Sequence, residues 1–232
     1  MQISAQKKWI VPLAIFGGLV LVLILSNREV KSPEDLGVID TGEKYARALQ
    51  IAQEMTQPIF KKADAGEALS DQEKDQLFTA GRLIDNANNL LPDRTIPFLG
   101  AGKAYMFAGD YGLAEQRFRQ AINNVPFDKG TPQAQETGYE AHYRLSQLRF
   151  NIHDYKGAVE EATAAINGQP QGVEYYVARA SALIQLKKYK EADFDLHSAL
   201  KIEKDFQPAI RLHKLLEMED PKTFGIKPGL KH

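Results

Sequence analysis

Apolar residues recur at helical spacing along most of the chain. After residue 39 they fall three or four positions apart, which places them on one face of successive helices. Two helix starts are marked by a capping residue followed three positions later by Glu, at Asp40 with Glu43 and at Ser70 with Glu73. No comparable run alternates with a period of two, so the pattern predicts helices throughout and gives no support to a sheet.

A set of nine positions recurs three times in the same order and at the same spacing. The first copy comprises Phe98, Gly102, Tyr105, Gly109, Tyr111, Ala114, Phe118, Ala121 and Pro126. The second comprises His142, Ser146, Arg149, His153, Tyr155, Ala158, Ala162, Ala165 and Pro170. The third comprises Tyr176, Ala180, Leu183, Lys187, Tyr189, Ala192, Leu196, Ala199 and Lys204. The last two copies are offset by 34 residues, and a further step of 34 from Val173 reaches Gln207, where another amphipathic helix begins.

This pattern resembles the tetratricopeptide repeat (TPR) family, whose unit is a 34-residue helix-turn-helix with small residues where its two helices touch. The resemblance covers Thr95 to about Met218, and the first copy is the best match. It implies an all-α fold, a right-handed superhelix of helix-turn-helix repeats with a concave inner wall. The recurring alanines fit this architecture, because packed helix axes approach within about 8 to 10 Å.

The same pattern predicts how the chain is organised. The expected segments are a tail (1–8), a transmembrane helix (9–27), a linker (28–39), a degenerate helical pair (40–94), TPR-like repeats (95–128, 139–172 and 173–206), an insertion (129–138), a capping helix (207–219) and a tail (220–232). Within the insertion, Thr131 and Pro132 have the form of an N-cap and a first helical position, so we expect much of it to extend the next helix.

The N-terminal segment is far more apolar than the remainder. Trp9 to Leu25 is a run of 17 residues without a charged or polar side chain. As a helix it covers about 25 Å of a roughly 30 Å hydrocarbon core. The run therefore predicts a single transmembrane helix with Trp9 at the headgroup level. A cleaved signal peptide is the alternative, although no small-x-small cleavage site follows the run.

Charges flanking this run are nearly balanced, with Lys7 and Lys8 before it and the pair Arg28 and Lys31 after it. We expect the N-terminus to lie inside, which predicts a single-pass protein of a bacterial inner membrane with an extracytoplasmic soluble domain. Ala14 and Gly18 have the spacing that lets two such helices approach closely, so a weak homodimer is a further expectation, with plain lipid-facing packing as its alternative.

Composition removes several classes of function. The chain has no cysteine, which excludes disulfides, thiol nucleophiles and cysteine-ligated metal centres. Its formal net charge is −1, from 29 Lys and Arg against 30 Asp and Glu, so it has no excess of positive charge to follow a phosphate backbone. We therefore expect no nucleic-acid partner.

The TPR resemblance also implies a binding surface, because the concave wall of the family comes mostly from the first helix of each pair. In this chain the implied groove residues are Leu99, Lys103, Met106, Tyr143, Arg144, Gln147, Phe150, Val177, Ser181, Ile184 and Gln185. They are mostly apolar with two cations, and the Lys, Asn and Arg set by which the family clamps the C-terminal carboxylate of heat-shock chaperones is incomplete. We expect an extended or helical protein segment with apolar side chains and an acidic group near Lys103 or Arg144. For each residue the alternative is packing against the next repeat.

Other motifs in the sequence lack the partners that their chemistry requires. FLGAGKAY (residues 98–105) has part of a phosphate loop, but Pro97 stands in place of the first glycine and Ala104 in place of the hydroxyl residue. Asp193 and His197 lie four apart on one helix face, and such a pair without a third ligand is typical of an exposed polar face. We therefore expect no catalytic residues, no cofactor and no metal.

The sequence thus predicts a membrane-anchored protein-binding module and no enzyme. Its expected role is docking in the TPR groove, as a scaffold or as an assembly or chaperone-adaptor factor of the cell envelope. The alternative is a solenoid-based envelope enzyme or accessory subunit with an unrecognised carboxylate site, which predicts a polar cleft with convergent carboxylates.

Overall fold

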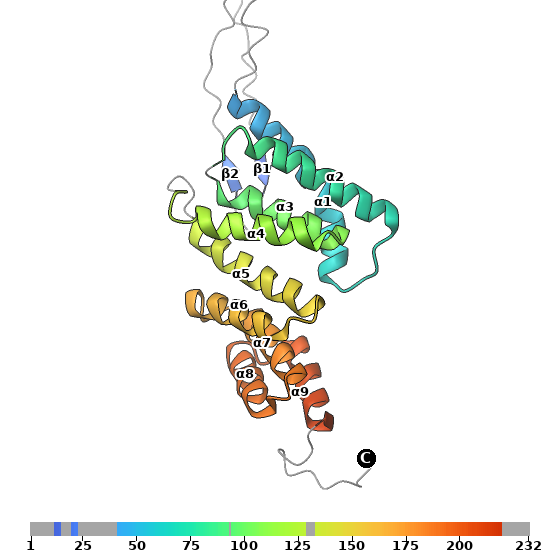
Figure 1. The fold of residues 1–232 in the computed structure, drawn as a ribbon, viewed down its shortest axis with the longest axis vertical. Coiled ribbons are helices and arrows are strands. Elements are labelled where there is room, and N and C mark those ends of the chain that lie inside the picture. Colours follow the sequence, from blue (N-terminus) through green and yellow to red (C-terminus); the bar gives the residue numbers. More distant parts are fainter. Residues whose placement is uncertain (1–11, 15–19, 23–40, 93, 129–132, 220–232) are drawn as a thin grey trace, which may run out of the picture.

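Antiparallel helices packed one after another make up nearly all of the structure (Figure 1). The computed structural model describes residues 12–14, 20–22, 41–92, 94–128 and 133–219. Its helices are α1 (Thr41–Asp64), α2 (Asp71–Asn88), α3 (Thr95–Ala108), α4 (Tyr111–Asn124), α5 (Ala134–Asn151), α6 (Tyr155–Gly168), α7 (Val173–Gln185), α8 (Tyr189–Ile202) and α9 (Gln207–Glu219). Two three-residue strands, β1 (Pro12–Ala14) and β2 (Val20–Val22), precede them.

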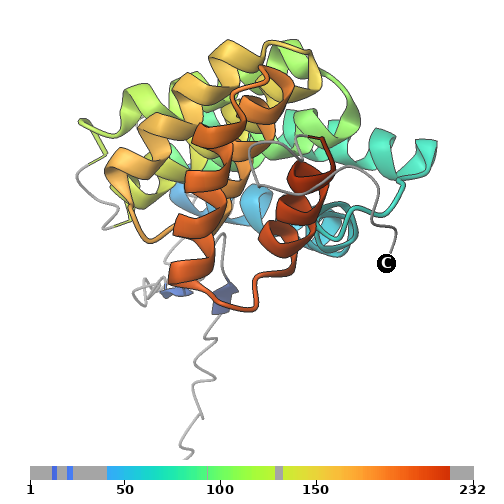
Figure 2. The ribbon, with the colours of Figure 1, turned by 90° about the horizontal axis from the view of Figure 1, so that it is seen from below.

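The helices are arranged in two layers. Each helix contacts the next one in sequence, and the odd-numbered helices α1, α3, α5, α7 and α9 also contact one another along the stack. Figure 2 looks along this stack from the end at which α9 lies. The odd-numbered helices therefore form a continuous inner layer, and α2, α4, α6 and α8 form the outer layer.

Local capping chemistry explains where several helices begin. Ser70 and Glu73 form the capping box that their spacing predicts, because the Ser70 side chain accepts from the Glu73 N–H and the Glu73 carboxylate accepts from the Ser70 N–H. Asp110 caps α4 and Asp154 caps α6 in the same way, by accepting a backbone N–H three residues ahead. The N-terminus of α3 is capped by a residue distant in sequence, because the buried Asp128 carboxylate accepts from the backbone N–H of Thr95 at 2.8 Å.

Small residues fill the contacts between helices. The alanines at the recurring positions are fully buried or nearly so: Ala114, Ala121, Ala158, Ala162, Ala165, Ala180, Ala192 and Ala199. Gly102 of α3 faces the buried ring of Phe118 in α4, and a methyl group at Gly102 would lie 2.5 Å from two carbons of that ring. The Gly102 position in the repeat therefore serves close packing.

The turns between paired helices repeat as well. Gly109, His153 and Lys187 occupy the same place in successive repeats, and all three adopt a positive φ, of 95°, 65° and 60°. Glycine adopts this conformation without strain, whereas the other two residues adopt it at a cost in free energy. The backbone of the turn is thus retained although the sequence at this position changes.

The helix that follows the insertion begins within it. α5 starts at Ala134 with Gln133 as its N-cap residue, and Gln133 makes no side-chain capping hydrogen bond. Residues 134–138 of the insertion are therefore helical. Thr131 and Pro132, at which the sequence predicts the helix start, lie outside the described residues.

The N-terminal segment differs from its prediction. The sequence predicts one transmembrane helix over 9–27, but Pro12–Ala14 and Val20–Val22 pair as antiparallel strands, with Leu13 opposite Leu21. Gly17 and Gly18 between them in the sequence have low helix propensity, and valine favours extended backbone. The remainder of the predicted span lies outside the described residues. Among the helices that the structure describes, none is both long enough and apolar enough to cross a bilayer.

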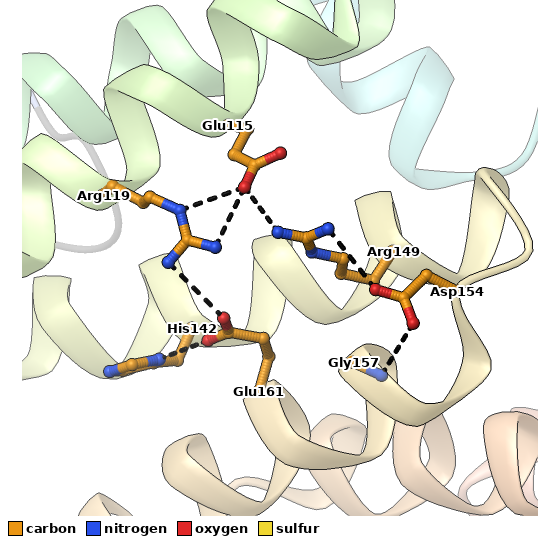
Figure 3. Close-up of polar contacts among 7 residues, drawn as sticks. All are labelled: Glu115, Arg119, His142, Arg149, Asp154, Gly157 and Glu161. Atoms are coloured by element: carbon orange, nitrogen blue, oxygen red, sulfur yellow. Dashed lines mark hydrogen bonds and ion pairs between the residues drawn. The ribbon is translucent and has the colours of Figure 1, made fainter.

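A polar network links α4, α5 and α6 (Figure 3). Glu115 of α4 accepts from Arg119 at 2.9 Å in its own helix and from Arg149 of α5. Glu161 of α6 lies 2.7 Å from the Nδ1 atom of His142 and 3.9 Å from Arg119. These contacts bind neighbouring repeats to each other outside the apolar core.

Comparable bridges join other helix pairs. Arg117 of α4 binds both carboxylate oxygens of Asp85 in α2, at 2.6 and 2.9 Å. The Tyr105 hydroxyl donates to the same carboxylate at 2.7 Å. In the last repeat Arg179 of α7 binds Asp195 of α8 in the same two-pronged way, at 2.7 and 2.8 Å. Such planar pairs fix orientation as well as distance.

Replacing Gly102 by Ala tests the close contact between α3 and α4. We expect the free energy of unfolding to fall by about 1 to 3 kcal/mol, because the added methyl must displace the buried Phe118 ring. Urea denaturation followed by circular dichroism measures it. Gly112→Ala is the matched control, since Gly112 is exposed and its added methyl meets nothing closer than 3.6 Å. Equal effects of the two substitutions would contradict the proposed packing constraint.

Candidate functional site

A hollow of about 550 Å³ opens on the inner layer, between α3, α5 and α7. The end of α1 and the start of α9 complete its wall. Its lining residues are Asp64, Met106, Phe107, Tyr143, Ser146, Gln147, Phe150, Asn151, Glu174, Val177, Ala178, Ser181, Phe206 and Pro208. The wall of this larger hollow has eight aliphatic or aromatic residues among fourteen, whereas the smaller hollow described next brings together the carboxylates of Asp64, Glu140 and Glu174, as the enzyme alternative predicts.

A second hollow of about 420 Å³ continues from the first. It shares Asp64, Phe107, Tyr143, Gln147 and Glu174 with the larger hollow. Its additional lining residues are Ala63, Glu140, Arg144 and Tyr175. We call the two hollows together the inner groove.

Most of the groove residues implied by the TPR resemblance line this space. The residues in the larger hollow are Met106, Tyr143, Gln147, Phe150, Val177 and Ser181, and Arg144 lines the smaller one. Leu99 packs instead against the core cluster that includes Ala52 of α1, and Ile184 packs against the core of the last repeats. Lys103 lies beside Asp64 and lines neither hollow.

The two cations of the predicted surface have partners within the protein. Arg144 donates to Glu140 at 2.7 Å and to Asp64 at 3.1 Å. The Lys103 ammonium lies 3.8 Å from Asp64 and 5.0 Å from the centre of the Phe60 ring. The sequence led us to expect that one of these cations would bind an acidic group of a ligand, whereas both are paired with carboxylates of the protein. The difference is due to Asp64, a residue of α1 that lies 80 positions before Arg144 in the sequence and pairs with it in the structure.

Burial changes the titration of two residues here. Desolvation, followed by repulsion from Arg144, lowers the pKa of Lys103. Desolvation raises the pKa of Tyr143 to about 12, so its hydroxyl stays neutral at physiological pH. This hydroxyl accepts a hydrogen bond from Gln147 at 2.9 Å.

Tyr143 is part of the groove's fixed wall. Its ring lies 5.2 Å from that of Tyr175 in α7 and 5.2 Å from the Arg144 guanidinium. Phe150 is held in a similar way, with its ring 5.4 Å from that of Tyr155. Both aromatics therefore present one face to the groove and use another to join helices.

Sequence reasoning missed eleven of the eighteen residues that line the inner groove: Asp64, Phe107, Ser146, Asn151, Glu174, Ala178, Phe206 and Pro208 in the larger hollow, and Ala63, Glu140 and Tyr175 in the smaller one. Phe107 and Glu174 lie at the ends of the first helices of their repeats, beyond the positions that the resemblance nominates. Asp64 and Phe206 come from the degenerate first pair and from the chain just before α9. A helical-wheel analysis extended to the ends of the odd-numbered helices could have identified Phe107 and Glu174.

Comparisons with known proteins agree with the fold. Residues 173–206 match the family model of the tetratricopeptide repeat. No curated protein matches the sequence. The structure is similar to that of MamA (residues 41 to the end) from Desulfovibrio magneticus RS-1, with a TM-score of 0.58 and 17% identity, covering 80% of this chain and 88% of that one.

Two further solved structures are similar. A second structure of MamA gives a TM-score of 0.52 at 19% identity, covering 69% of this chain and 83% of that one. The APC/C hetero-tetramer Cut9–Hcn1 gives 0.54 at 16% identity, covering 76% of this chain and 36% of that one. These similarities confirm the TPR-like, all-helical repeat fold that the sequence predicts.

Replacing Lys103 by Met tests the cost of its burial. We expect the free energy of unfolding to rise by about 1 kcal/mol, because methionine fills a similar volume without a desolvated charge and Asp64 keeps Arg144 as its partner. Guanidinium denaturation measures the change. Lys188→Met is the control at an exposed lysine and should leave stability nearly unchanged. A loss of stability in Lys103→Met would show that the Asp64 pair outweighs the desolvation.

Proposed function

We propose that the inner groove binds a segment of another protein that carries apolar side chains and a basic residue. Proteins with the TPR fold are generally non-enzymatic interaction modules, which supports docking as the activity. The proposal rests on one observation. The cations Arg144 and Lys103 are paired with carboxylates of the protein itself, whereas one carboxylate of the groove is available to a ligand.

Glu174 is that carboxylate. It is exposed, lines both hollows of the inner groove, and forms no ion pair with the residues that the structure describes. Asp64 and Glu140 share their charge with Arg144. Lys103 lies beside Asp64 just outside the two hollows, so the three carboxylates and two cations of this region leave one net negative charge, which favours a Lys or Arg of the ligand.

The apolar part of the ligand would contact Met106, Phe107, Phe150 and Val177. These side chains come from three successive odd-numbered helices, so the segment would cross them in turn. The arrangement suits an extended or helical segment whose side chains alternate between pockets. We propose a scaffold or assembly role on this basis, and we propose its place in the cell envelope from the uncharged run Trp9 to Leu25.

Selection from an unbiased displayed peptide library on the immobilised full chain tests this function. We expect enriched peptides to combine apolar side chains with Lys or Arg. Glu174→Lys should reverse the charge preference toward Asp and Glu, because it places a cation where the ligand's basic residue binds. Glu160→Lys makes the same change on the outer helix α6 and should leave the selected peptides unchanged.

Ala178→Gln completes the test by adding bulk to the groove wall without deleting a contact of the core. We expect it to weaken binding of a selected peptide by about tenfold or more while far-ultraviolet circular dichroism stays the same. Enrichment of acidic peptides by the unaltered chain, no enrichment, or undiminished binding by Ala178→Gln would each contradict the proposal.

Membrane attachment is the second part of the proposal. Its support is the uncharged run Trp9 to Leu25, whose length matches most of a hydrocarbon core. A spanning segment must satisfy its own backbone hydrogen bonds, so the proposal requires the strands β1 and β2 to be replaced by a helix over this run in lipid. The globular part would then face the extracytoplasmic side, and Ala14 with Gly18 would permit weak pairing of two chains.

Alkaline carbonate extraction of membranes carrying the full chain tests the attachment. We expect the chain to stay in the membrane pellet, and Ile15→Arg with Leu21→Arg to release it, because each central arginine costs about 2.5 kcal/mol or more. Gln2→Arg with Ser4→Arg adds the same charge outside the run and should not release it. Extraction of the unaltered chain would overturn this part of the proposal.

A further inference from the structure

Three potential metal ligands meet where α8 and α9 are in contact. Asp193 and His197 lie on α8, and His213 lies on α9. One ligand atom from each residue lies within 4.8 Å of the other two. The sequence shows the first two as a pair without a third ligand, and the packing of α9 against α8 supplies that ligand.

Two distances within this cluster are close to those of a coordination shell. The Asp193 Oδ1 atom lies 3.2 Å from His197 Nδ1 and 3.0 Å from His213 Nε2. In a tetrahedral site with bonds of about 2.1 Å, ligand atoms are about 3.4 Å apart. Both distances are a few tenths of an ångström shorter than this, so the Asp193 oxygen and the imidazole nitrogens would move slightly apart around one ion.

The Asp193 Oδ1 atom provides independent support. It is buried from solvent, yet it accepts no hydrogen bond from the part of the chain that the structure describes, although two imidazole nitrogens lie close to it. A buried carboxylate oxygen needs a donor or a cation, and here either a protonated imidazole nitrogen or a bound ion can supply it. A cation between the three side chains would satisfy it.

An outer carboxylate completes the arrangement. Glu217 Oε1 lies 3.5 Å from the Nδ1 atom of His213, opposite the Nε2 atom that faces Asp193. Histidines that bind metals usually donate their second ring N–H to such a carboxylate, which fixes the tautomer and the ring orientation. His197 would exchange its contact with the Asp193 backbone oxygen, at 2.9 Å, for the metal.

We propose that Asp193, His197 and His213 bind one divalent transition-metal ion, with Zn²⁺ as the best match. Two imidazoles and one carboxylate favour Zn²⁺ or a similar first-row ion over Mg²⁺ and Ca²⁺, which prefer oxygen ligands throughout. The ion fastens α9 to α8. This role suits α9, whose buried residues are only Ala209 and Leu216 among those that the structure describes.

Titration of the metal-stripped full chain, in detergent, with Co²⁺ tests the site. Co²⁺ substitutes for Zn²⁺ and reports its coordination by visible absorption. We expect a band that saturates at one ion per chain and disappears when Zn²⁺ is added. At Zn²⁺ about a hundredfold above its Kd, the midpoint of thermal unfolding should rise by about 5 to 10 °C.

Variants separate this site from adventitious binding by histidine. His213→Ala should abolish both the band and the thermal shift, and Glu217→Gln should weaken binding about tenfold. His197→Ala is the second test should His213→Ala fail to fold, because the His197 side chain is 66% exposed and contributes little packing. It should abolish the one-to-one band as well.

His142→Ala is the matched control. His142 pairs with Glu161 at 2.7 Å but has no third ligand in the polar network of Figure 3, so its loss should leave metal binding unchanged. Absence of saturable binding by the unaltered chain would show that the cluster is held by histidine–carboxylate ion pairs alone. That result, or equal binding by both His197→Ala and the unaltered chain, would overturn the proposal.

Discussion

The close approach of neighbouring helices is the constraint on which the rest of this structure depends. Alanine occupies contact positions in each successive helix pair, and glycine replaces it where a ring enters, as at Gly102 against Phe118. Small side chains bury little apolar area individually. Stability therefore comes from repetition, because each helix pair covers the apolar face that its neighbour would otherwise expose. The two hollows of the inner groove follow from the same stacking.

Polar side chains extend this packing to the outer layer. The odd-numbered helices contact one another directly, whereas long arginine side chains span the outer helices, from Arg117 to Asp85 and from Arg119 to Glu161. When the helices of one layer lie closer together than those of the other layer, the stack curves so that the closely spaced layer is on the inside. The inner layer thus becomes concave, and the two-pronged Arg117 pair holds α2 and α4 in a defined orientation.

The inner groove uses elements from both ends of the array, and the proposed metal cluster uses the last two helices. α1 places Asp64 beside Arg144 and Lys103, and Glu140 also pairs with Arg144, which leaves Glu174 as the available charge of the inner groove. At the other end, Phe206 just before α9 and Pro208 at its start contribute to the groove wall, and α9 contributes His213 to the cluster with Asp193. An ion that fixes α9 to α8 would also fix one wall of the groove. Metal binding and ligand binding would then be linked through the position of α9.

Local and periodic features of this protein were determined by its sequence alone. Spacing was enough to find the Ser70–Glu73 capping box, the repeat at 173–206 and the alanine contacts, because these depend on neighbours a few residues away or on a fixed period. Seven of the eighteen residues that line the inner groove also followed, since first-helix positions recur with the repeat. The tertiary structure alone decided which charges pair and which ligands meet. Arg144 pairs with Asp64, which is 80 residues away in the sequence, and His213 of α9 lies beside Asp193 of α8. Such contacts depend on how helices cross, and a linear pattern does not specify that geometry.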